Sequence, residues 1–599
     1  MPSRLRWEYL PEPSESAITA LAESLFPRNL LPWHRVMACL LLQRGLESVF
    51  RVKEYFSPTL KKPDGVTLKR LSEATLMSNM LRAVDEISAT IERKERILIY
   101  GDYDVDGTCA VSILYLFLKK VYPDTPGVPP YPFVLTYVPD RYKEGYGVSQ
   151  AGIDYAVAHD VKLIITLDCG IQAHEMVLYA KKYGIRVIVT DHHTPSKELP
   201  QAFAVLNPKL DAHRYPKQDV HRYSCKELCG AGIAFKLVQA LCERFSLPQE
   251  AAYTYLDLVA LATCADIVPL TGENRVLVAE GLRRINDPNI PTPVLDQLLA
   301  TAKRPIEVRD LVFVAAPRIN AAGRMAHANM AIALLTGQDP SILEKIEQLN
   351  QQRRSLDKDI FEEAYAQVAE AHDEEAPATV VFSETWHKGV IGIVASRLME
   401  HYYRPTIVFT RSGDVLSGSA RSVEGYDLYK ALGKCKQYLI QYGGHKAAAG
   451  MTLRPEHYQN FKKQFQKVVA RDLPLSYRMP LLTLSAELSL SDITYDFYHE
   501  LQKLAPFGPE NMDPVFYAHG VLAKQVRRIG KDFSHLRMIL TDPKSNHDFV
   551  AVGFGLGYQE SLIGSGQPLT IAYQLTENEW QGRKSLELIL KAVKPMTNE

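Results

Sequence analysis

Acidic and histidine side chains follow apolar runs at four places in the first half of the chain. They are Asp102, Asp104 and Asp106 in GDYDVDG, Asp168 in ITLDCG, Asp191, His192 and His193 in VTDHH, and Asp266 in ATCADIV. Period-two spacing directs the first three acids to one side of an extended segment. Burying an acid at the end of an apolar run is costly without a partner or a cation. Any one of these residues could be a solvated or hydrogen-bonded structural residue, but the four sets together indicate a metal site.

Carboxylate and imidazole ligands together suit manganese, magnesium or a related divalent ion. At least five acids carry too much negative charge for one ion, whereas two ions that share a bridging carboxylate would balance it. Paired ions of this kind lie about 3.5–4 Å apart, activate a water molecule and hold a phosphoryl centre during in-line displacement. The pattern therefore predicts hydrolysis of a phosphoester or phosphoanhydride with two Mn²⁺ or Mg²⁺ ions.

Short apolar runs rich in β-branched residues alternate with amphipathic stretches between residues 96 and 193. The expected strands lie in 97–100, 133–140, 161–170 and 185–193, and the expected helices include 109–122 and 173–184. This alternation predicts a doubly wound parallel sheet. Because ligands bind at the carboxyl ends of the strands in such a sheet, three separate strands are expected to deliver the acids and histidines to one edge.

The rest of the chain predicts a multidomain α/β protein that ends in a β-barrel. Near Pro340 the pattern changes to a helical stripe of apolar residues, which predicts a long connecting helix. Strand and helix runs follow again, and short alternating runs after residue 480 predict a small barrel. The expected parts are an N-terminal helical region (1–90), the doubly wound domain (91–338), the connecting helix (339–376), a smaller α/β domain (377–473) and the barrel (474–599).

Composition excludes few functions. The chain has 599 residues, and its 69 basic and 69 acidic side chains give a formal net charge of zero. A neutral total does not indicate nucleic acid, yet a local basic channel inside a neutral protein can bind it. No run has signal-peptide character or approaches membrane-spanning length, so a cytoplasmic protein is expected. The sequence leaves the oligomeric state open, and a monomer is expected. The eight cysteines are expected to be reduced, since Cys225 and Cys229 lack the second pair that a zinc site needs.

A series of motifs resembles the DHH phosphoesterase superfamily, which is named for the triplet found here at residues 191–193, and within it the RecJ family. In order over residues 95–516 they are GDYDVDG, TLDCG, VTDHH, LCGAGIAFKL, LVALATCADIVPLTGENR, APRINAAGRM, WHKGVIGIVASRL, GSARS, YGGHKAAAG and LAPFGPEN. The triplet alone would be a weak signal, whereas ten ordered motifs are specific. The segment DTPGVPPYPF, residues 124–133, looks like an insertion that could alter the rim of the site.

The resemblance implies a single-strand-specific DNA exonuclease that works 5′ to 3′ with Mn²⁺ or Mg²⁺, releases 5′ mononucleotides, and serves recombination and repair. The implied partners are single-stranded DNA with a 5′ phosphate, a helicase and a single-strand-binding protein. The implied metal ligands are Asp104, Asp106, Asp168, His192 and Asp266, with Asp102 either a further ligand or a support for its neighbours. Asp168 is expected to bridge two ions, His193 to face the scissile phosphate, and Asp191 to orient the histidines.

The second α/β domain resembles the DHH-associated domain, whose GGH signature stands here as Gly443, Gly444 and His445. Two glycines let a backbone approach a phosphate closely, and the histidine can donate a hydrogen bond and act in catalysis; taken alone, the segment would be a plain turn. The resemblance also implies Arg141, Arg318, Ser419 and Arg421 for the 5′ phosphate, Asn320 for the strand's backbone, and Arg324 as a further candidate. Arginine forks suit terminal phosphates, although a single arginine most often forms a surface ion pair.

The last 120 or so residues predict an OB-like barrel, a fold that binds single strands by stacking bases on aromatic rings beside basic side chains. The candidate contacts are Phe516, Tyr517, Arg527, Arg528, Lys531, Phe533, His535 and Arg537. None is diagnostic, because most aromatic residues of a small barrel belong to its core. The two α/β domains are expected to form a groove that admits a single strand and excludes a duplex.

Three alternative functions stay open on the sequence. A DHH phosphatase or oligoribonuclease would act on very short RNA or nucleotide bisphosphates, but such proteins are usually shorter and lack the barrel. An inactive DHH protein that serves as a replication scaffold is expected to lose metal ligands, whereas every ligand position is filled here. The related inorganic pyrophosphatases share the metal chemistry but not the barrel, and a preference for pyrophosphate over DNA would identify them.

Overall fold

The computed structural model describes residues 5–28, 30–60, 71–124, 132–210, 223–339, 341–545 and 547–596. Most of the insertion expected at 124–133 therefore lies outside the described residues. The chain divides into two compact units. The parallel-sheet unit comprises Ser57–Arg353 and Pro506–Met512, and the barrel-containing unit comprises Met1–Phe56, Arg354–Ala505 and Asp513–Glu599. The boundary falls within the long helix α17 (Ile342–Glu370), where the sequence predicts a connecting helix.

The parallel-sheet unit is built on five strands in the order β3-β2-β4-β5-β6. The strands are β2 (Arg96–Gly101), β3 (Val134–Tyr137), β4 (Val161–Leu167), β5 (Arg186–Thr190) and β6 (Ala204–Leu206). Every neighbouring pair is parallel, so all carboxyl ends lie at one edge. The central strands are apolar and buried along nearly their whole length, as expected for a sheet covered on both faces. The predicted doubly wound sheet is confirmed.

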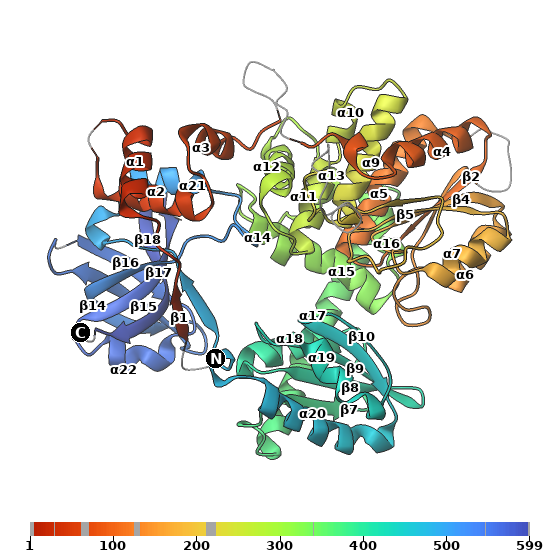
Figure 1. The fold of residues 1–599 in the computed structure, drawn as a ribbon. Coiled ribbons are helices and arrows are strands. Elements are labelled where there is room, and N and C mark those ends of the chain that lie inside the picture. The colour runs from red at the N-terminus through yellow and green to blue at the C-terminus, as the bar shows by residue number, and fades with distance from the viewer. Residues whose placement is uncertain are drawn as a thin grey trace. The chain divides into compact units, whose positions relative to one another are not determined.

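Helices cover both faces of this sheet (Figure 1). One face carries a large apolar core to which α4, α5, α9 and α11 contribute, and the other face carries a smaller core with α6 and α7. The helices of the unit are α4 (Met80–Glu92), α5 (Val105–Val121), α6 (Gln150–Ala158), α7 (His174–Lys182), α9 (Gly230–Arg244), α10 (Glu250–Tyr253), α11 (Leu256–Ala265), α12 (Gly272–Asn286), α13 (Pro293–Leu298), α14 (Val308–Asp310), α15 (Ala316–Met325) and α16 (Asn329–Leu335), with the 3₁₀ helix η1 (Ala74–Leu76) and the π-helix η2 (Leu311–Ala315).

The barrel-containing unit includes a five-stranded mixed sheet in the order β10-β11-β9-β8-β7. Its elements are β7 (Thr379–Ser383), α18 (Ile391–Tyr402), β8 (Thr406–Ser412), β9 (Val415–Arg421), α19 (Leu428–Gly433), η3 (Lys436–Tyr438), β10 (Leu439–Gly444), β11 (Ala448–Leu453), η4 (Pro455–His457) and α20 (Tyr458–Asp472). Phe461 and Phe465 of α20 pack with alternate residues of β9 and β11 in one core. The expected α/β texture is present, and β10 is an additional strand that the sequence analysis did not predict.

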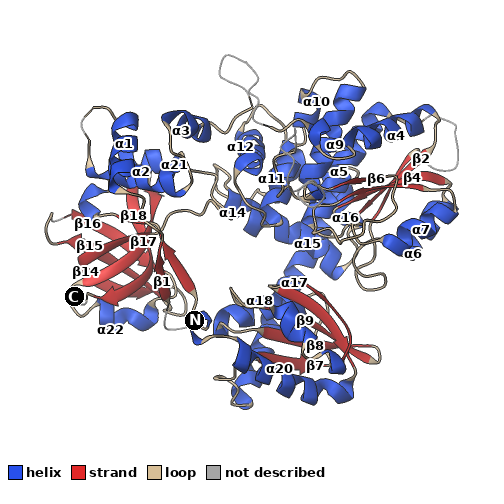
Figure 2. Cartoon of the chain, viewed as in Figure 1, coloured by secondary structure: helices blue, strands red, loops and turns tan. Residues whose placement is uncertain are grey.

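The C-terminal strands form a closed barrel (Figure 2). Its sheet order is β13-β14-β15-β16-β18-β17, and a further pairing of β14 with β17 closes it. The elements are β13 (Ala486–Glu487), α21 (Tyr495–Gln502), β14 (Phe516–Ile529), β15 (His535–Asp542), β16 (His547–Gly553), α22 (Glu560–Ile563), β17 (Leu569–Trp580) and β18 (Arg583–Pro595), with turns η5 (Leu475–Tyr477), η6 (Leu490–Asp492) and η7 (Gly557–Gln559). The predicted OB-like barrel is confirmed. Phe516 is fully buried in it, so this residue is a core side chain and the prediction that it contacts DNA is wrong.

The described N-terminal region is mostly helical and begins with a strand. Its elements are β1 (Arg6–Tyr9), α1 (Glu15–Leu25), α2 (Pro32–Gln43) and α3 (Val49–Phe56). Strand β1 pairs in parallel with β12 (Leu481–Leu484), which precedes the barrel, so the two distant segments belong to one body. None of the helices in the described part of the chain is long and apolar enough to cross a membrane. All eight cysteines are free thiols.

Candidate metal centre

The carboxyl edge of the parallel sheet gathers the predicted metal ligands. Asp102 directly follows β2, Asp168 directly follows β4, and His192 with His193 lies just beyond β5, while Asp266 ends α11. Three overlapping groups have ligand atoms within 4.8 Å of one another. They are Asp168, His192 and His193; Asp106, His192 and Asp266; and Asp102, Asp104 and Asp168. The strands and α11 therefore place at one edge side chains that lie far apart in sequence.

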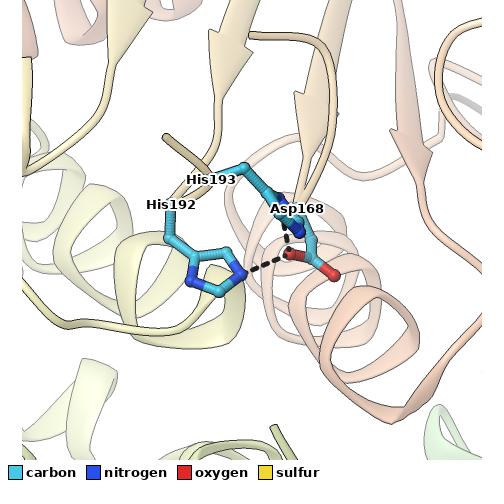
Figure 3. A group of neighbouring side chains, drawn as sticks. All are labelled: Asp168, His192 and His193. Carbon is cyan, nitrogen blue, oxygen red and sulfur yellow. Dashed lines mark ion pairs between the residues drawn. The ribbon is translucent and has the colours of Figure 1, made fainter. Parts of the chain in front are cut away.

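The His192 and His193 rings both pair with the Asp168 carboxylate (Figure 3), and His192 also lies near the other carboxylates. Its Nε2 lies 3.2 Å from Asp168 Oδ1, 3.6 Å from Asp266 Oδ2 and 3.9 Å from Asp106 Oδ2. Among the described residues, His192 Nε2, Asp168 Oδ1 and Asp102 Oδ1 are buried yet have no hydrogen-bond partner. Unsatisfied buried polar atoms are rare, and a cation that shares them would satisfy all three. The donor set thus fits a divalent-cation centre.

Asp106 is held by the N-terminus of α9. Its Oδ2 accepts a hydrogen bond from the backbone N–H of Gly230 at 2.5 Å, and its Oδ1 accepts one from Ala231 at 2.7 Å. A helix N-terminus stabilises negative charge and supplies backbone donors that have no partner within the helix. The contact is close, because a Cβ built on Gly230 would lie 2.6 Å from Asp168 Cβ and 3.0 Å from Asp106 Oδ2. Glycine at position 230 lets α9 approach two candidate ligands at once.

Asp168 adopts a backbone conformation that is unusual for its residue type. Its φ is 59°, in the left-handed region that L-residues other than glycine enter at a cost of about 1–2 kcal/mol. The following turn is held by a hydrogen bond from Thr166 Oγ1 to the Cys169 carbonyl at 2.8 Å. Backbone strain of this kind persists where the surrounding structure over-determines it, often at functional sites. Here it accompanies a carboxylate that belongs to two of the three ligand groups.

The electrostatics of the acids also call for a cation. Burial raises the pKa of Asp102, Asp106 and Asp168, and nearby carboxylates raise it further. Burial, with Asp106 and Asp104 next in order, raises the pKa of Asp266 to about 9. The His192 imidazole behaves in the opposite way, since burial lowers its pKa and favours the neutral ring that binds metals. Without cations, the ionised carboxylates repel one another in a buried place.

Metal-free protein is therefore expected to lose stability as the pH rises from about 5 to 8, and Mn²⁺ is expected to restore it. The pKa of each of these acids is higher in the folded chain than in the unfolded chain, so the folded state keeps protons that the unfolded state has released, and the free energy of unfolding falls with rising pH. A cation that binds only the folded state stabilises it by mass action. Melting temperatures in EDTA and in excess Mn²⁺ at both pH values test this. An Mn²⁺-induced rise that is no larger at the higher pH would contradict it.

Asp191 orients His193 rather than joining the ligand groups. Its Oδ1 accepts hydrogen bonds from His193 Nδ1 at 2.8 Å and from the His193 backbone N–H at 3.0 Å, and its Oδ2 accepts one from Ile171 N at 2.9 Å. Burial would raise the pKa of Asp191, but these hydrogen bonds outweigh it and lower the value. Burial likewise opposes the cationic form of His193, yet the bond to Asp191 raises its pKa overall. His193 is thus fixed by the Asp191 carboxylate, which makes the imidazolium form easier to reach than in a free histidine.

Two side chains at this edge were missed by the sequence analysis. The Tyr146 hydroxyl lies 3.2 Å from His193 Nδ1 and donates to the Asp168 carbonyl at 3.3 Å. Asn207, which follows β6, donates from Nδ2 to the His193 carbonyl at 2.9 Å. The sequence offered a signal for Tyr146, because this tyrosine stands between two glycines in YKEGYG. In the structure both glycines have positive φ. Asn207 also occupies the carboxyl end of a strand, where ligand-binding residues collect.

The predicted phosphate-binding residues of the parallel-sheet unit differ from one another in the groups they contact. Arg141 stacks on the Tyr103 ring, 4.6 Å from its centroid, beside the acidic turn. Helix α15 also passes close to that turn, because a Cβ on Gly323 would lie 2.7 Å from the Tyr103 carbonyl oxygen. On α15, Arg318 donates from Nε to Glu347 Oε2 at 2.7 Å and from Nη1 to the Val314 carbonyl at 2.7 Å. Asn320 and Arg324 on α15 are half-buried, and the Tyr142 hydroxyl donates to the Arg324 carbonyl.

The other predicted phosphate-binding residues lie together in the mixed sheet of the barrel-containing unit. Ser419 and Arg421 are two apart on β9, and Arg421 Nη1 donates to Ser419 Oγ at 3.2 Å. Gly443 and Gly444 end β10, and the exposed His445 donates its backbone N–H to the Ala448 carbonyl at 2.8 Å. Gly444 is required by the turn, since its φ is 135° and a Cβ would lie 2.4 Å from Ala448 O. The GGH segment is thus a tight turn of the same sheet, separated from Ser419 and Arg421 by β11.

Family models match three parts of the chain. The DHH family N-terminal domain matches residues 96–263, the DHHA1 domain matches residues 375–471, and the RecJ OB domain matches residues 484–592. The single-stranded-DNA-specific exonuclease RecJ of Bacillus subtilis (strain 168) is 33% identical over 596 residues, which cover 98% of this chain and 71% of that protein. Sequence similarity therefore extends from the metal edge through the barrel.

Solved structures show the same architecture. The crystal structure of RecJ in complex with Mn²⁺ from Thermus thermophilus matches with a TM-score of 0.78 at 28% identity, covering 100% of this chain and 81% of that chain. The Mg²⁺ complex from the same organism matches with a TM-score of 0.73 at 27% identity, covering 100% of this chain and 80% of that chain. Similarity to RecJ along the whole chain, together with a ligand set that fits divalent cations, shows that this chain belongs to the RecJ family of the DHH phosphoesterase superfamily.

Proposed function

We propose that the chain is a metal-dependent 5′→3′ exonuclease that hydrolyses single-stranded DNA to 5′ mononucleotides with two divalent cations. One observation carries the proposal: three overlapping groups of carboxylates and imidazoles share buried, unsatisfied ligand atoms at the carboxyl edge of a parallel sheet. Relatives that cover most of the chain are named single-stranded-DNA-specific exonucleases, which supports DNA as the substrate. The acid content favours two ions over one, because a single divalent ion could not balance five carboxylates.

Asp168 is the proposed bridging ligand. It belongs to one group with His192 and His193 and to another with Asp102 and Asp104, so its carboxylate can serve both. The third group joins Asp106 and Asp266 to His192. When bound, paired divalent ions lower the pKa of a water molecule and neutralise charge on the phosphoryl oxygens. The chain itself contributes the spacing of the ligands, which the strand ends and the N-terminus of α9 set.

His193 is proposed to stabilise the charge that develops on the phosphoryl group. Its Nδ1–H is committed to Asp191, which leaves the Nε2 side of the ring for the substrate. Because the hydrogen bond to Asp191 raises the pKa of His193, the ring holds a proton more readily than a free imidazole does. The Tyr146 phenol stays protonated, since burial and then Asp191 raise its pKa, and its hydroxyl lies against the same ring. Donors fixed in this way before the reaction are what stabilise a developing oxyanion.

Phosphate binding is proposed for Arg141 in the parallel-sheet unit and, separately, for Ser419, Arg421 and His445 in the barrel-containing unit. Arg141 makes no ion pair with another described residue, and its guanidinium stacks on the Tyr103 ring. The guanidinium N–H groups can therefore bind an oxyanion. Arg318 would have to exchange Glu347 for a phosphate, so we give it a weaker role. A substrate of this kind also requires proteins that expose it, and a helicase and a single-strand-binding protein are the proposed partners in recombination and repair.

The outer face of the barrel is proposed to bind the phosphates of the DNA single strand. Arg527 on β14 and Arg537 on β15 stand directly opposite each other in register, and neither forms an ion pair with another described residue. Like charges in opposed positions destabilise a sheet, and a bound phosphate would relieve the repulsion. The rings of Phe533 and Phe554 are exposed, and Phe554 packs on His535, 5.3 Å between ring centroids, two residues before Arg537 on β15. Exposed rings beside paired arginines suit a single strand.

Replacing Arg527 and Arg537 by alanine is expected to weaken binding of single-stranded DNA, oligodeoxythymidine included, about equally for all sequences. The number of counterions released on binding is expected to fall by about two. Each arginine that neutralises one phosphate releases about one counterion, so the slope of log affinity against log salt should fall accordingly. Fluorescence anisotropy over a salt series measures this. The exposed Arg309 on α14, which pairs with Glu307, provides a matched arginine-to-alanine control. An unchanged slope in the double variant would argue against this face.

The proposed function is tested with purified protein and Mn²⁺ on four substrates: 5′-phosphorylated single-stranded DNA, the same sequence as a blunt duplex, a dinucleotide and pyrophosphate. Asp106→Ala is the inactive control. Mononucleotides released from the 5′ end of the single strand, but not from the duplex or by the variant, support the exonuclease. Cleavage of the dinucleotide alone would indicate an oligoribonuclease, and preference for pyrophosphate would indicate a pyrophosphatase. No hydrolysis of any substrate would overturn the proposal and favour a scaffold.

A further inference from the structure

The backbone directly after the candidate ligand Asp266 is strained. Ile267 has a φ of 60°, in the left-handed region where a β-branched residue is a genuine outlier. Its side chain is 68% exposed, so packing of that side chain does not hold the conformation. Strain of this kind persists only where the surrounding structure over-determines it. The contacts that fix the loop after Ile267 therefore also fix the position of Asp266.

One anchor of this loop comes from a turn late in the chain. The turn is Pro506–Met512, which lies within the LAPFGPEN motif and its following residue, and it is named here the 506–512 turn. It belongs to the parallel-sheet unit, although Ala505 and Asp513 on either side of it belong to the barrel-containing unit. The Pro509 carbonyl accepts a hydrogen bond from the backbone N–H of Leu270 at 2.8 Å. The loop that carries Asp266 is thus bound to a segment that precedes the barrel strand β14.

Gly508 of this turn packs directly on the Leu270 side chain. A Cβ built on Gly508 would lie 2.4 Å from Leu270 Cδ1 and 2.8 Å from Leu270 Cγ, closer than real Cβ contacts come. Gly508 does not have a positive φ, so glycine at this position serves the close approach rather than the backbone conformation. Leu270 is fully buried, and a side chain in a packed core has little room to move aside. A side chain at position 508 would therefore displace Leu270 and its loop.

The 506–512 turn is itself held by local hydrogen bonds. The Gly508 N–H donates to the Asn511 carbonyl at 3.1 Å, and the Asn511 N–H donates to the Gly508 carbonyl at 2.9 Å. The side chain of Asn511 is buried, and its Nδ2 donates to the Pro506 carbonyl at 2.9 Å. A turn closed in this way can serve as a fixed support for Leu270.

The loop after Asp266 has a second anchor in α12. The buried Asn274 donates from Nδ2 to the Pro269 carbonyl at 3.0 Å and to the Glu227 carbonyl at 2.6 Å. Two successive residues of the loop, Pro269 and Leu270, are therefore fixed by different elements. These two anchors account for the left-handed conformation that directly follows Asp266.

We propose that the 506–512 turn is a positioning element of the metal centre, which holds Asp266 within reach of the ion that Asp106 and His192 also bind. This role rests on the proposed function, whose two cations need the full ligand set. The turn contributes no residue to the three ligand groups; it acts through Leu270, and Gly508 sets the distance between them. Replacing residues that orient metal ligands commonly costs about 10–100-fold in metal affinity or activity.

Gly508→Ala tests the turn in the full-length enzyme, by calorimetric titration with Mn²⁺ in the absence of DNA. The wild type is expected to bind two ions, and the variant is expected to bind one of them about tenfold more weakly. At limiting Mn²⁺, kcat on 5′-phosphorylated single-stranded DNA should fall by a similar factor and recover in excess Mn²⁺. KM for the DNA should stay within a factor of about two, because the turn acts on the metal rather than on the substrate.

A double variant tests whether the effect passes through Leu270. In Gly508→Ala combined with Leu270→Ala, the nearest atom of residue 270 to the new methyl group would be its Cβ, at an ordinary 3.5 Å. The double variant should therefore bind Mn²⁺ more tightly than Gly508→Ala alone. Gly553→Ala in the barrel is the matched control, because its Cβ would lie 2.8 Å from Leu556 Cδ1. The control should lower the melting temperature in the same way and leave both Mn²⁺ affinities unchanged.

Two outcomes would overturn this role of the turn. Wild-type Mn²⁺ affinities in Gly508→Ala would show that the turn only stabilises the fold, and an equal loss of affinity in Gly553→Ala would show that metal binding follows overall stability. Should Gly508→Ala fail to fold, Leu270→Val takes its place, and unchanged Mn²⁺ affinities in that variant would refute the role as well. A wild-type enzyme that binds Mn²⁺ but leaves single-stranded DNA intact would refute the proposed function alone, because the titration uses no DNA.

Discussion

Asp168→Asn is expected to lower kcat on single-stranded DNA by on the order of a thousandfold or more, while raising the melting temperature of the metal-free protein. The loss of activity follows from the position of Asp168, whose carboxylate belongs to two ligand groups and whose Oδ1 is buried without a hydrogen-bond partner among the described residues. An amide is neutral and ligates divalent cations weakly, so both proposed ions lose a ligand. Turnover at saturating substrate and Mn²⁺ measures this effect.

The gain in stability has the opposite cause. Burial, and then the neighbouring carboxylates of Asp106, Asp104, Asp102 and Asp266, raise the pKa of Asp168 well above its usual range. In the metal-free enzyme Asp168 therefore occupies a buried position where an ionised carboxylate is costly. An amide has nearly the same shape and carries no charge, so the substitution removes that electrostatic cost. Melting temperatures in EDTA and in Mn²⁺ are expected to differ much less for the variant than for the wild type.

The exposed Asp414 in the turn between β8 and β9 provides the matched control, because Asp414→Asn changes the same group outside any ligand cluster. Its activity and its melting temperature are expected to stay near those of the wild type. Retention of full kcat in Asp168→Asn would show that this carboxylate is no bridging ligand. A lower melting temperature of that variant in EDTA would show that Asp168 stabilises the fold through its charge.

Gly230→Ala is expected to reduce kcat by on the order of a hundredfold, although residue 230 supplies no side chain to the site. The added methyl group would lie 2.6 Å from Asp168 Cβ and 2.9 Å from Asp168 Cγ, closer than real Cβ contacts come. Either α9 retreats, and Asp106 loses its hydrogen bonds from Gly230 and Ala231, or Asp168 moves. A displacement of about 1 Å of catalytic groups is enough to lower the rate by that factor.

Stability is expected to fall by about 1–3 kcal/mol in Gly230→Ala, as is usual when a methyl group is forced into a packed core. Gly232→Ala is the matched control on the same helix, because the nearest atoms to its Cβ would belong to the Leu228 side chain, at 3.2 Å or more, and alanine favours the helix. The control is expected to keep its activity. Wild-type activity in Gly230→Ala, with crystals or spectra showing α9 unmoved, would show that the close approach does not position the ligands.

The sequence by itself determined which chemistry the protein could perform and what kind of fold would hold it. β-Branched runs ending at Asp102, Asp168 and Asp191 predicted a parallel sheet with acids at its carboxyl edge, because strand direction alone brings such ends together. Both the sheet and the barrel follow from local periodicity, which a single sequence displays. The short strand β10 was not predicted, since its run ends in two glycines and shows little alternation.

Only the tertiary structure decided how the predicted residues act. Asp106 accepts two hydrogen bonds from the backbone of α9, about 124 residues later in the chain. Arg318 donates a hydrogen bond to Glu347 on another helix. Tyr146 reaches His193 because two left-handed glycines turn the chain there. Contacts of this range depend on how the helices pack, and no local pattern reports packing. Residue types and their spacing thus predicted the metal site, whereas the packing of α9 and the neighbouring loops determined which partner each side chain contacts.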